Sequence, residues 1–401
     1  MREDRSPAAI GPLSISRNPS RPVNAGGKNL KGVYFMEHFN PLLRGASSPQ
    51  KFITIGEIML RLTPPDYEKI RMATSYEASY GGSEANIALA LASLGVDSTF
   101  FTVVPDNSLG KSAIRMLRSN DVHCGPVIFS TPQQTPTHRM GTYYLETGYG
   151  IRASEVIYDR KHSAITEFDF DSFDLKNLLK DYTWLHLSGI TPALGENCRK
   201  LVMRSLQIAK EMGLVTSFDG NFRSALWTWE EARDFCTQCL PYIDVLFGIE
   251  PYHLWRDEED HGKGDVKDGV PLQPDFDQQE EVFRAFVKRY PNLQCIARHV
   301  RYAYSGSENS LKAYMWYNGQ TYESYKLTFN ILDRVGAGDA FAGGLLYGMM
   351  NGYEPGEMLN FAVASSAIKH TIRGDANLID NVAVIRNLMK ASLGNGFDIK
   401  R

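Results

Sequence analysis

The chain has 401 residues, of which 43% are hydrophobic and 22% are charged, and its formal net charge is −3. This composition excludes a wholly disordered protein, and the charge gives no electrostatic footprint for nucleic acid or an anionic membrane. No run of 18 apolar residues is present, which excludes a membrane-spanning helix. Five scattered cysteines indicate a reducing compartment, so we expect a cytoplasmic protein.

The first 50 residues differ in composition from the rest of the chain. Ser, Pro, Asn, Arg and Gly dominate them without apolar periodicity, which predicts a disordered tail or a start upstream of the native one, with Met36 as an alternative initiator. An organelle transit peptide is the other interpretation, but Glu3 and Asp4 weigh against it because such peptides are poor in acidic residues. We expect the ordered domain to span residues 51–395.

From Lys51 onward, apolar runs typical of strands alternate with segments of helical periodicity. This pattern predicts strands at 52–56, 98–104, 184–187, 214–218, 242–247 and 293–297. It predicts helices at 84–94, 109–119, 196–212, 228–240 and 279–290, and two more from about 340 and 355. Asn318-Gly319 predicts a hairpin, and the polar stretch 256–274 predicts a surface insertion. The alternation predicts an α/β fold with a mostly parallel sheet and helices on both faces.

A glycine-rich turn at 333–344 is the most informative stretch of the sequence. It reads Asp-Arg-Val-Gly-Ala-Gly-Asp-Ala-Phe-Ala-Gly-Gly and lies between a strand-like run and a helix of small residues. A Gly-x-Gly turn that opens a helix aims backbone N–H groups outward, where the helix dipole adds partial positive charge suited to an anion. Asp339 in the first helical turn can accept a proton from a hydroxyl that attacks a phosphoryl group. The alternative is a tight turn in which Asp339 only caps the helix.

Two motifs resemble the ribokinase/PfkB family of sugar kinases. The turn ending in Asp339 is similar to the family's C-terminal signature, with Arg334 where Thr is usual, and Gly81-Gly82-Ser-Glu-Ala-Asn86 is similar to its N-terminal signature. The resemblance implies a ribokinase-like three-layer αβα fold with a small β-sheet lid from about 62–80 and 137–152. It also implies ATP and Mg²⁺ as cofactors. By the same resemblance, Asp339 is the general base, Gly81, Gly82 and Asn86 bind the sugar, and the anion hole is formed by Gly336, Ala337 and Gly338.

A third segment resembles 2-keto-3-deoxygluconate kinases within that family. Asp219-Gly-Asn221-Phe-Arg223 follows a predicted parallel strand, at the edge where open α/β sheets place ligands. The resemblance implies that Asp219 and Asn221 bind the substrate and that Arg223 contacts its acid end, for which a guanidinium is well suited. Tyr144 and Arg152 would reach the sugar from the lid.

The nucleotide end matches the family less well. The chain reads Gly248-Ile-Glu250-Pro251 where the family often has Asn-x-x-Glu, so Glu250 is the candidate that acts on Mg²⁺ through water. The resemblance implies nucleotide contacts from Arg298 or Arg301, from Gly338, and from Asn377 near the adenine.

The resulting expectation is ATP-dependent phosphorylation of the terminal hydroxyl of 2-keto-3-deoxygluconate. Two alternatives stay open: a kinase of another sugar, such as fructose or a riboside, and a catalytically silent sugar-binding regulatory protein. We also expect a homodimer or higher homo-oligomer formed through the lid, because 62–80 is rich in Tyr and Met, which are enriched at interfaces.

Overall fold

The parallel core of the fold is a nine-stranded sheet in the order β14-β13-β12-β11-β10-β9-β1-β4, with β15 paired to β13. The computed structural model describes residues 50–252, 273–379 and 381–391, so the predicted tail and most of the predicted insertion lie outside the described residues. The described residues belong to a single unit, Asn40–Arg401. Within them, no helix combines the length and apolar character that crossing a membrane requires.

The sheet is parallel from β4 to β12 and antiparallel at the β13 edge, which confirms the predicted mostly parallel arrangement. Its central strands are buried along most of their length, as expected where both faces of a sheet are covered. The predicted hairpin is confirmed at Asn318-Gly319, where both residues have positive φ. The strands are β1 (Lys51–Ile55), β4 (Asp97–Phe101), β9 (Trp184–Ser188), β10 (Val215–Asp219), β11 (Val245–Phe247), β12 (Cys295–Ala303), β13 (Glu308–Tyr317), β14 (Gln320–Glu323) and β15 (Leu327–Asn330).

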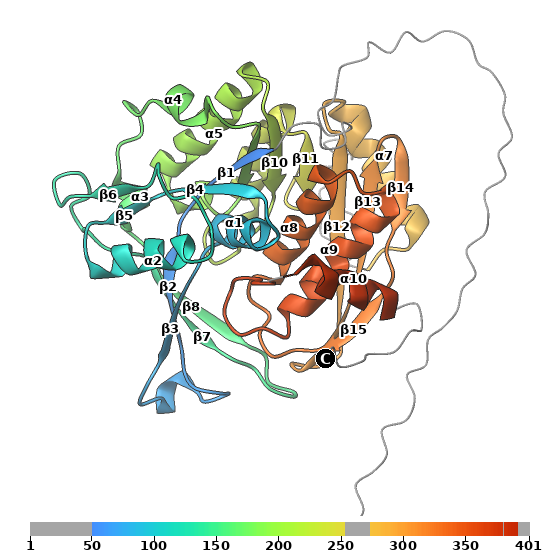
Figure 1. Cartoon of the computed structure of the whole chain (residues 1–401), viewed down its shortest axis with the longest axis horizontal. Coiled ribbons are helices and arrows are strands. Elements are labelled where there is room, and N and C mark those ends of the chain that lie inside the picture. Colours follow the sequence, from blue (N-terminus) through green and yellow to red (C-terminus); the bar gives the residue numbers. More distant parts are fainter. Residues whose placement is uncertain (1–49, 253–272, 380, 392–401) are drawn as a thin grey trace, which may run out of the picture. The chain divides into compact units, whose positions relative to one another are not determined.

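Helices cover both faces of this sheet, so the fold has the three layers that the resemblance implied (Figure 1). Successive strand residues alternate between the two cores: Phe52 packs with α1, α8 and α9, whereas Ile53 packs with helices of the opposite layer. The layer on the Phe52 side contains α1 (Ser83–Ser93), α8 (Ala337–Met350) and α9 (Pro355–Lys369). The opposite layer contains α3 (Ala164–Glu167), α4 (Leu175–Leu179), α5 (Glu196–Glu211), α6 (Trp229–Cys239) and α7 (Phe276–Arg289).

Two further helices extend the layer that contains α1. Ile114 and Leu117 of α2 (Ser108–Arg118) pack against α1, and α10 (Val382–Ala391) packs against α9 through Ile385. Beside α2, β5 (Val103–Pro105) pairs with β6 (Ile128–Ser130) as a small separate sheet.

A second sheet of four strands, in the order β3-β2-β7-β8, forms the predicted lid. Figure 1 shows these strands together, away from the central sheet. The lid is larger than the ranges 62–80 and 137–152 predict, because β2 begins at Met59 and β8 lies beyond residue 152. The exposed strand β8 lacks the buried face that would have marked it in the sequence. The lid strands are β2 (Met59–Thr63), β3 (Glu77–Gly81), β7 (Thr142–Glu146) and β8 (Glu155–Asp159).

Candidate active site

The N-termini of α1 and α8 meet at the carboxyl edge of the parallel sheet. Helix α8 begins after Gly336, whose φ of 80° favours glycine, and a Cβ there would clash with the carbonyl oxygen of Asp375. Further along α8, a Cβ on Gly343 would lie 3.0 Å from the Cβ of Ala90 in α1. The small residues that the sequence places in α8 therefore let the two helices approach closely enough for side chains at their N-termini to interact.

Asp339 is held between these helices by hydrogen bonds to both of its carboxylate oxygens. Ser83 Oγ donates to Oδ1 and Asn86 Nδ2 donates to Oδ2, each at 2.7 Å. Asn221 Nδ2 donates to Ser83 Oγ at 2.8 Å, so a continuous path runs from Asn221 through Ser83 to Asp339. The structure thus brings together three predicted site residues, Asn86, Asn221 and Asp339, and adds Ser83, to which the sequence assigned no role.

The capping alternative for Asp339 does not match this geometry. The N-cap position of α8 is Gly336, and no side chain caps the helix. In the first turn of α8, the backbone N–H groups of Gly338 and Asp339 have no acceptor oxygen among the described residues. Two amide donors at a helix N-terminus, beside a carboxylate, are suited to an anion whose acceptor hydroxyl lies next to a base.

Burial raises the pKa of Asp339, and the hydrogen bonds from Asn86 and Ser83 oppose that shift. Burial, followed by the charge of Asp339, raises the pKa of Asp219 to about 7, whereas the exposed Arg223 lowers it. Arg223 also lowers the pKa of Asp339, so its guanidinium acts electrostatically on both carboxylates. The predicted Asp219, Arg223 and Asp339 therefore form one electrostatic group.

The glycine pair at the start of α1 allows the lid and the C-terminal loop to pack closely there. A Cβ on Gly82 would clash with the carbonyl oxygen of Glu57, and a Cβ on Gly81 would clash with the carboxylate of Asp375. Next to them, Glu84 is buried and accepts from Ser188 Oγ at 2.8 Å and from Thr191 Oγ1 at 2.7 Å. Burial raises the pKa of Glu84, a site neighbour that the sequence did not single out.

The lid joins the glycine-rich turn at 333–344 through a buried charged network that the sequence did not predict. Arg61 of β2 donates to Asp333 Oδ2 at 2.5 Å and to Asp375 Oδ1 at 2.7 Å, and Tyr143 of β7 donates to Asp375 Oδ2 at 2.5 Å. All four residues are buried. Asp333 is the first residue of the quoted signature, but its partners lie far away in the sequence and follow no local pattern.

The predicted lid residues Tyr144 and Arg152 are not brought to the group around Asp339. Because neighbouring strand residues point to opposite faces, Tyr144 lies on the other side of β7 from Tyr143, with its ring 5.9 Å from that of Tyr76. Arg152 pairs with Glu146 at 2.8 Å and donates to the carbonyl oxygen of Tyr67 at 2.6 Å. The face of β7 toward the glycine-rich turn at 333–344 therefore carries Tyr143 and Leu145, against whose cluster Val335 packs.

Arg301 and Arg334 interact electrostatically beside the turn, whereas Arg298 points to the opposite face of β12, toward α7. Arg298 is buried, pairs with Glu250 at 3.8 Å and donates to Gln279. Arg334 is half-buried, and its buried Nε has no partner among the described residues. Loss of hydration, followed by the charges of Arg334 and Arg223, lowers the pKa of Arg301. This concentration of positive charge beside the free amides is suited to a polyphosphate.

Asn377 lies in the core rather than on this cationic surface. It is 3% exposed, and its Nδ2 donates to Ser365 Oγ of α9 at 2.9 Å. Among the described residues, no three His, Cys, Asp or Glu side chains gather as metal ligands.

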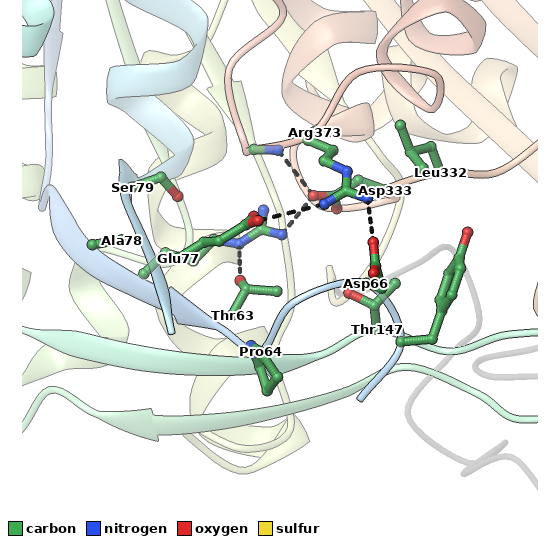
Figure 2. A pocket seen from close by; sticks show the side chains of 13 residues that line it. Thr63, Pro64, Asp66, Glu77, Ala78, Ser79, Thr147, Leu332, Asp333 and Arg373 are labelled. Carbon is green, nitrogen blue, oxygen red and sulfur yellow. Dashed lines mark hydrogen bonds and ion pairs between the residues drawn. The ribbon is translucent and has the colours of Figure 1, made fainter. Parts of the chain in front are cut away.

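A cavity of about 180 Å³ lies between the lid and the C-terminal loop, outside the group around Asp339. Figure 2 shows Arg373 crossing it toward Asp66 and Glu77, with which it pairs at 3.0 and 3.6 Å. None of the predicted site residues lines this cavity, although Asp333 does. Its wall therefore belongs to the lid attachment rather than to the candidate site.

The profile of the pfkB family carbohydrate kinases matches residues 49–251 and 302–381 of the chain. The chain belongs to this family. A relative from Haloferax volcanii, named 2-dehydro-3-deoxygalactonokinase, is 32% identical over 86% of the chain and 98% of its own length. A 2-dehydro-3-deoxygluconokinase from Thermoproteus tenax is 27% identical over 84% of the chain and 94% of its own length.

Solved structures agree with the ribokinase-like fold. The crystal structure of 2-dehydro-3-deoxygluconokinase from Thermotoga maritima is 34% identical, has a TM-score of 0.76, and is matched over 85% of this chain and 99% of its own. A ribokinase II from E. coli in complex with ATP and Mg²⁺, at 20% identity and a TM-score of 0.66, shares the fold. The chain is therefore a pfkB sugar kinase with a ribokinase-like α/β fold.

Proposed function

We propose that this pfkB kinase transfers the γ-phosphoryl group of ATP to the terminal hydroxyl of 2-keto-3-deoxygluconate, as a cytoplasmic enzyme of sugar-acid catabolism. The observation that carries the proposal is Asp339, fixed by Ser83 and Asn86 beside two free backbone N–H groups. The names of the relatives favour a keto-deoxy sugar acid over a neutral sugar. The intact Asp339 and its turn also favour an enzyme over a silent regulatory protein.

In the mechanism, Asp339 accepts the proton of the substrate hydroxyl as its oxygen attacks the γ-phosphorus. A pKa raised by burial makes the carboxylate a stronger base, while its two hydrogen bonds fix its direction. The N–H groups at the start of α8 donate to the transferring phosphoryl group, and the helix dipole stabilises its charge. Because these donors are in place before the reaction, little reorganisation is needed in the transition state.

The cationic side of the turn fits a nucleotide. Arg301 and Arg334 would neutralise phosphate oxygens, and Gly338 would donate its backbone N–H to the transferring group. Glu250 remains the candidate for a water-mediated contact with Mg²⁺, although its pairing with Arg298 occupies part of its carboxylate. When bound with ATP, Mg²⁺ supplies further charge neutralisation to the phosphates.

The acid end of the substrate would be bound by Arg223. This residue is exposed, lies after β10 and acts electrostatically on Asp219 and Asp339. In the Arg223→Ala variant, KM for the sugar acid should rise with little change in kcat, because the carboxylate is present in the ground and transition states alike. The expected loss is about 2–3 kcal/mol. Arg223→Lys is the matched control, because it keeps the charge but loses the paired hydrogen bonds. Its KM for the sugar acid should lie between those of wild type and Arg223→Ala.

The decisive experiment measures ADP release with a panel of acceptors. It includes 2-keto-3-deoxygluconate, 2-keto-3-deoxygalactonate, 5-keto-2-deoxygluconate, fructose and ribose. The proposal expects the highest kcat/KM for 2-keto-3-deoxygluconate, at least tenfold above the neutral sugars. A preference for fructose or ribose would show that the substrate is a neutral sugar. A preference for 2-keto-3-deoxygalactonate would change the stereochemistry assigned to the substrate. No turnover with any acceptor would favour the regulatory alternative.

We also propose that the chain forms a homodimer through the lid. Large hydrophobic side chains are exposed on it, namely Met72, Tyr76, Tyr149, Ile151, Val156 and Ile157. Aromatic side chains and Met are enriched at protein interfaces. Light scattering of the full chain should give twice the monomer mass of 45.0 kDa, and Ile157→Lys should shift it toward the monomer. A monomer across micromolar concentrations would contradict the proposal.

A further inference from the structure

The last residue of α9, Lys369, is fully buried, which is rare for a lysine without a close carboxylate partner. Its ammonium group donates to two backbone carbonyl oxygens, that of Ile372 at 3.1 Å and that of Asp333 at 3.4 Å. The Asp333 carbonyl belongs to the first residue of the catalytic turn. Lys369 therefore ties that turn to the loop that follows α9, and neither the sequence signature nor the proposed chemistry explains it.

The turn rests directly on this loop. Backbone N–H groups of Leu332 and Asp333 donate to the carbonyl oxygen of His370 at 2.7 and 3.1 Å, and the N–H of Gly374 donates to Asp333 Oδ2 at 3.0 Å. Gly336 is packed so closely against the Asp375 backbone that a Cβ would clash with it. A shift of the loop by a few tenths of an ångström would therefore move the start of α8.

Lys369 also completes a local balance of charge. Arg61, Asp333 and Asp375 form a buried network with one positive and two negative groups. The pKa of Lys369 is lowered, chiefly by burial, and Asp333 and Asp375 partly offset this shift. Its ammonium group is the second positive charge beside the two carboxylates. Asp339 offsets the pKa shift as well, so the catalytic carboxylate lies within the electrostatic reach of this ammonium group. Without Lys369, one buried negative charge would be uncompensated, which is costly in a low-dielectric interior.

We propose that Lys369 is a positioning residue for phosphoryl transfer: an internal cation that holds the Asp333 carbonyl and so fixes the amides and the base at the start of α8. This inference rests on the proposed kinase chemistry of that turn. The geometry predicts that a small cation able to donate to carbonyl oxygens can replace the ammonium group once the side chain is removed. The ammonium ion has the same charge and the same N–H donors as the lysine head group.

The test compares wild type with Lys369→Ala, which leaves space for an ion, and Lys369→Met, which fills that space with an apolar chain. We expect kcat to fall about 10²-fold in both folded variants, since a small misplacement of reacting groups can cost this much. Ammonium chloride should restore at least a tenth of wild-type kcat to Lys369→Ala in a saturable manner. It should not restore Lys369→Met, and sodium chloride at equal ionic strength should restore neither. Ser366→Ala removes a neutral 2.8 Å bond to the Ala337 carbonyl and serves as a control without an ammonium response.

Hydrogen–deuterium exchange of the peptide covering 333–340 gives a readout that needs no substrate. Exchange should be faster in Lys369→Ala than in wild type and should slow again with ammonium. If no protein, wild type included, turns over any acceptor but exchange responds as expected, the proposed function is rejected and the positioning role is kept. Three results would overturn the inference. Either folded variant could keep full kcat, ammonium could leave both kcat and exchange of Lys369→Ala unchanged, or both variants could fail to fold with ammonium present.

Discussion

The two sides of the glycine-rich turn at 333–344 differ in how their polar groups are satisfied. On the substrate side, both oxygens of Asp339 and the amide of Asn86 have partners within the chain. On the proposed nucleotide side, the N–H groups of Gly338 and Asp339 have no acceptor among the described residues, and Arg301 and Arg334 form no ion pair with any of them. In the proposed mechanism, the base is therefore positioned by the fold itself, whereas the positive charge on the other side of the turn is left for a ligand to neutralise.

Asp339→Asn should have the largest effect on this arrangement. Asn keeps the shape and can still bond to Ser83 and Asn86, but it cannot accept the substrate proton, so kcat should fall about 10²–10⁴-fold. The melting temperature should stay level or rise, because a buried charge is removed. Measurements of kcat at saturating substrates and of thermal unfolding test both points. If Asp339→Asn keeps more than a tenth of wild-type kcat at unchanged stability, Asp339 is not the base.

Arg61→Met should lower stability more than any exposed substitution, because it leaves Asp333 and Asp375 buried without their cation. Loss of one partner of a buried pair costs about 3–5 kcal/mol in the free energy of unfolding. Arg373→Met is the matched control: Arg373 is half exposed and pairs with Asp66 and Glu77, for which about 0–1 kcal/mol is expected. Urea unfolding measures both. Equal losses for the two variants would mean that the lid attachment does not depend on the buried pair.

Arg334→Thr should weaken ATP binding without affecting binding of the sugar acid. We expect KM for ATP to rise roughly tenfold, as for the loss of a charged hydrogen bond of about 1.5 kcal/mol, while KM for the sugar acid stays constant. Stability should not fall, since removal of Arg334 relieves its repulsion of Arg301. Initial rates with each substrate varied in turn measure the two constants. A rise in KM for the sugar acid alone would assign Arg334 to the substrate side.

Asp219→Asn should have the smallest effect, visible as a change in pH dependence. The pKa of Asp219 is raised to about 7 in the fold, so the unfolded chain loses this proton at lower pH than the native protein does. Wild-type stability therefore falls as pH rises from about 4 to 7, and Asn removes that loss. Thermal unfolding should show a stabilisation by Asp219→Asn that grows over this interval and then levels off. A stabilisation independent of pH would place the titration elsewhere.

The central sheet, its covering helices and the catalytic turn could be predicted because each follows from a local pattern. The apolar runs give strands, and the Gly-x-Gly-Asp spacing gives a helix N-terminus with a carboxylate in its first turn. Arg61 and Lys369 could not be predicted, since their partners at 333, 372 and 375 come together only in the folded chain. Tyr144 illustrates a related limit. A strand's register decides which of two neighbouring side chains faces the turn, and the sequence of β7 alone does not contain that register.

The small residues between α1, α8 and α9 have a consequence for how this enzyme can diverge. A Cβ on Gly344 would lie 2.9 Å from the Cβ of Ser365 in α9, as tight as the contact between Gly343 and Ala90. Added volume at either glycine would displace Asp339 relative to Asn86, so selection is expected to remove mutations there. Under the proposed function, changes in acceptor preference are therefore expected in the 219–223 segment, where a new side chain can alter the sugar that is accepted without moving Asp339.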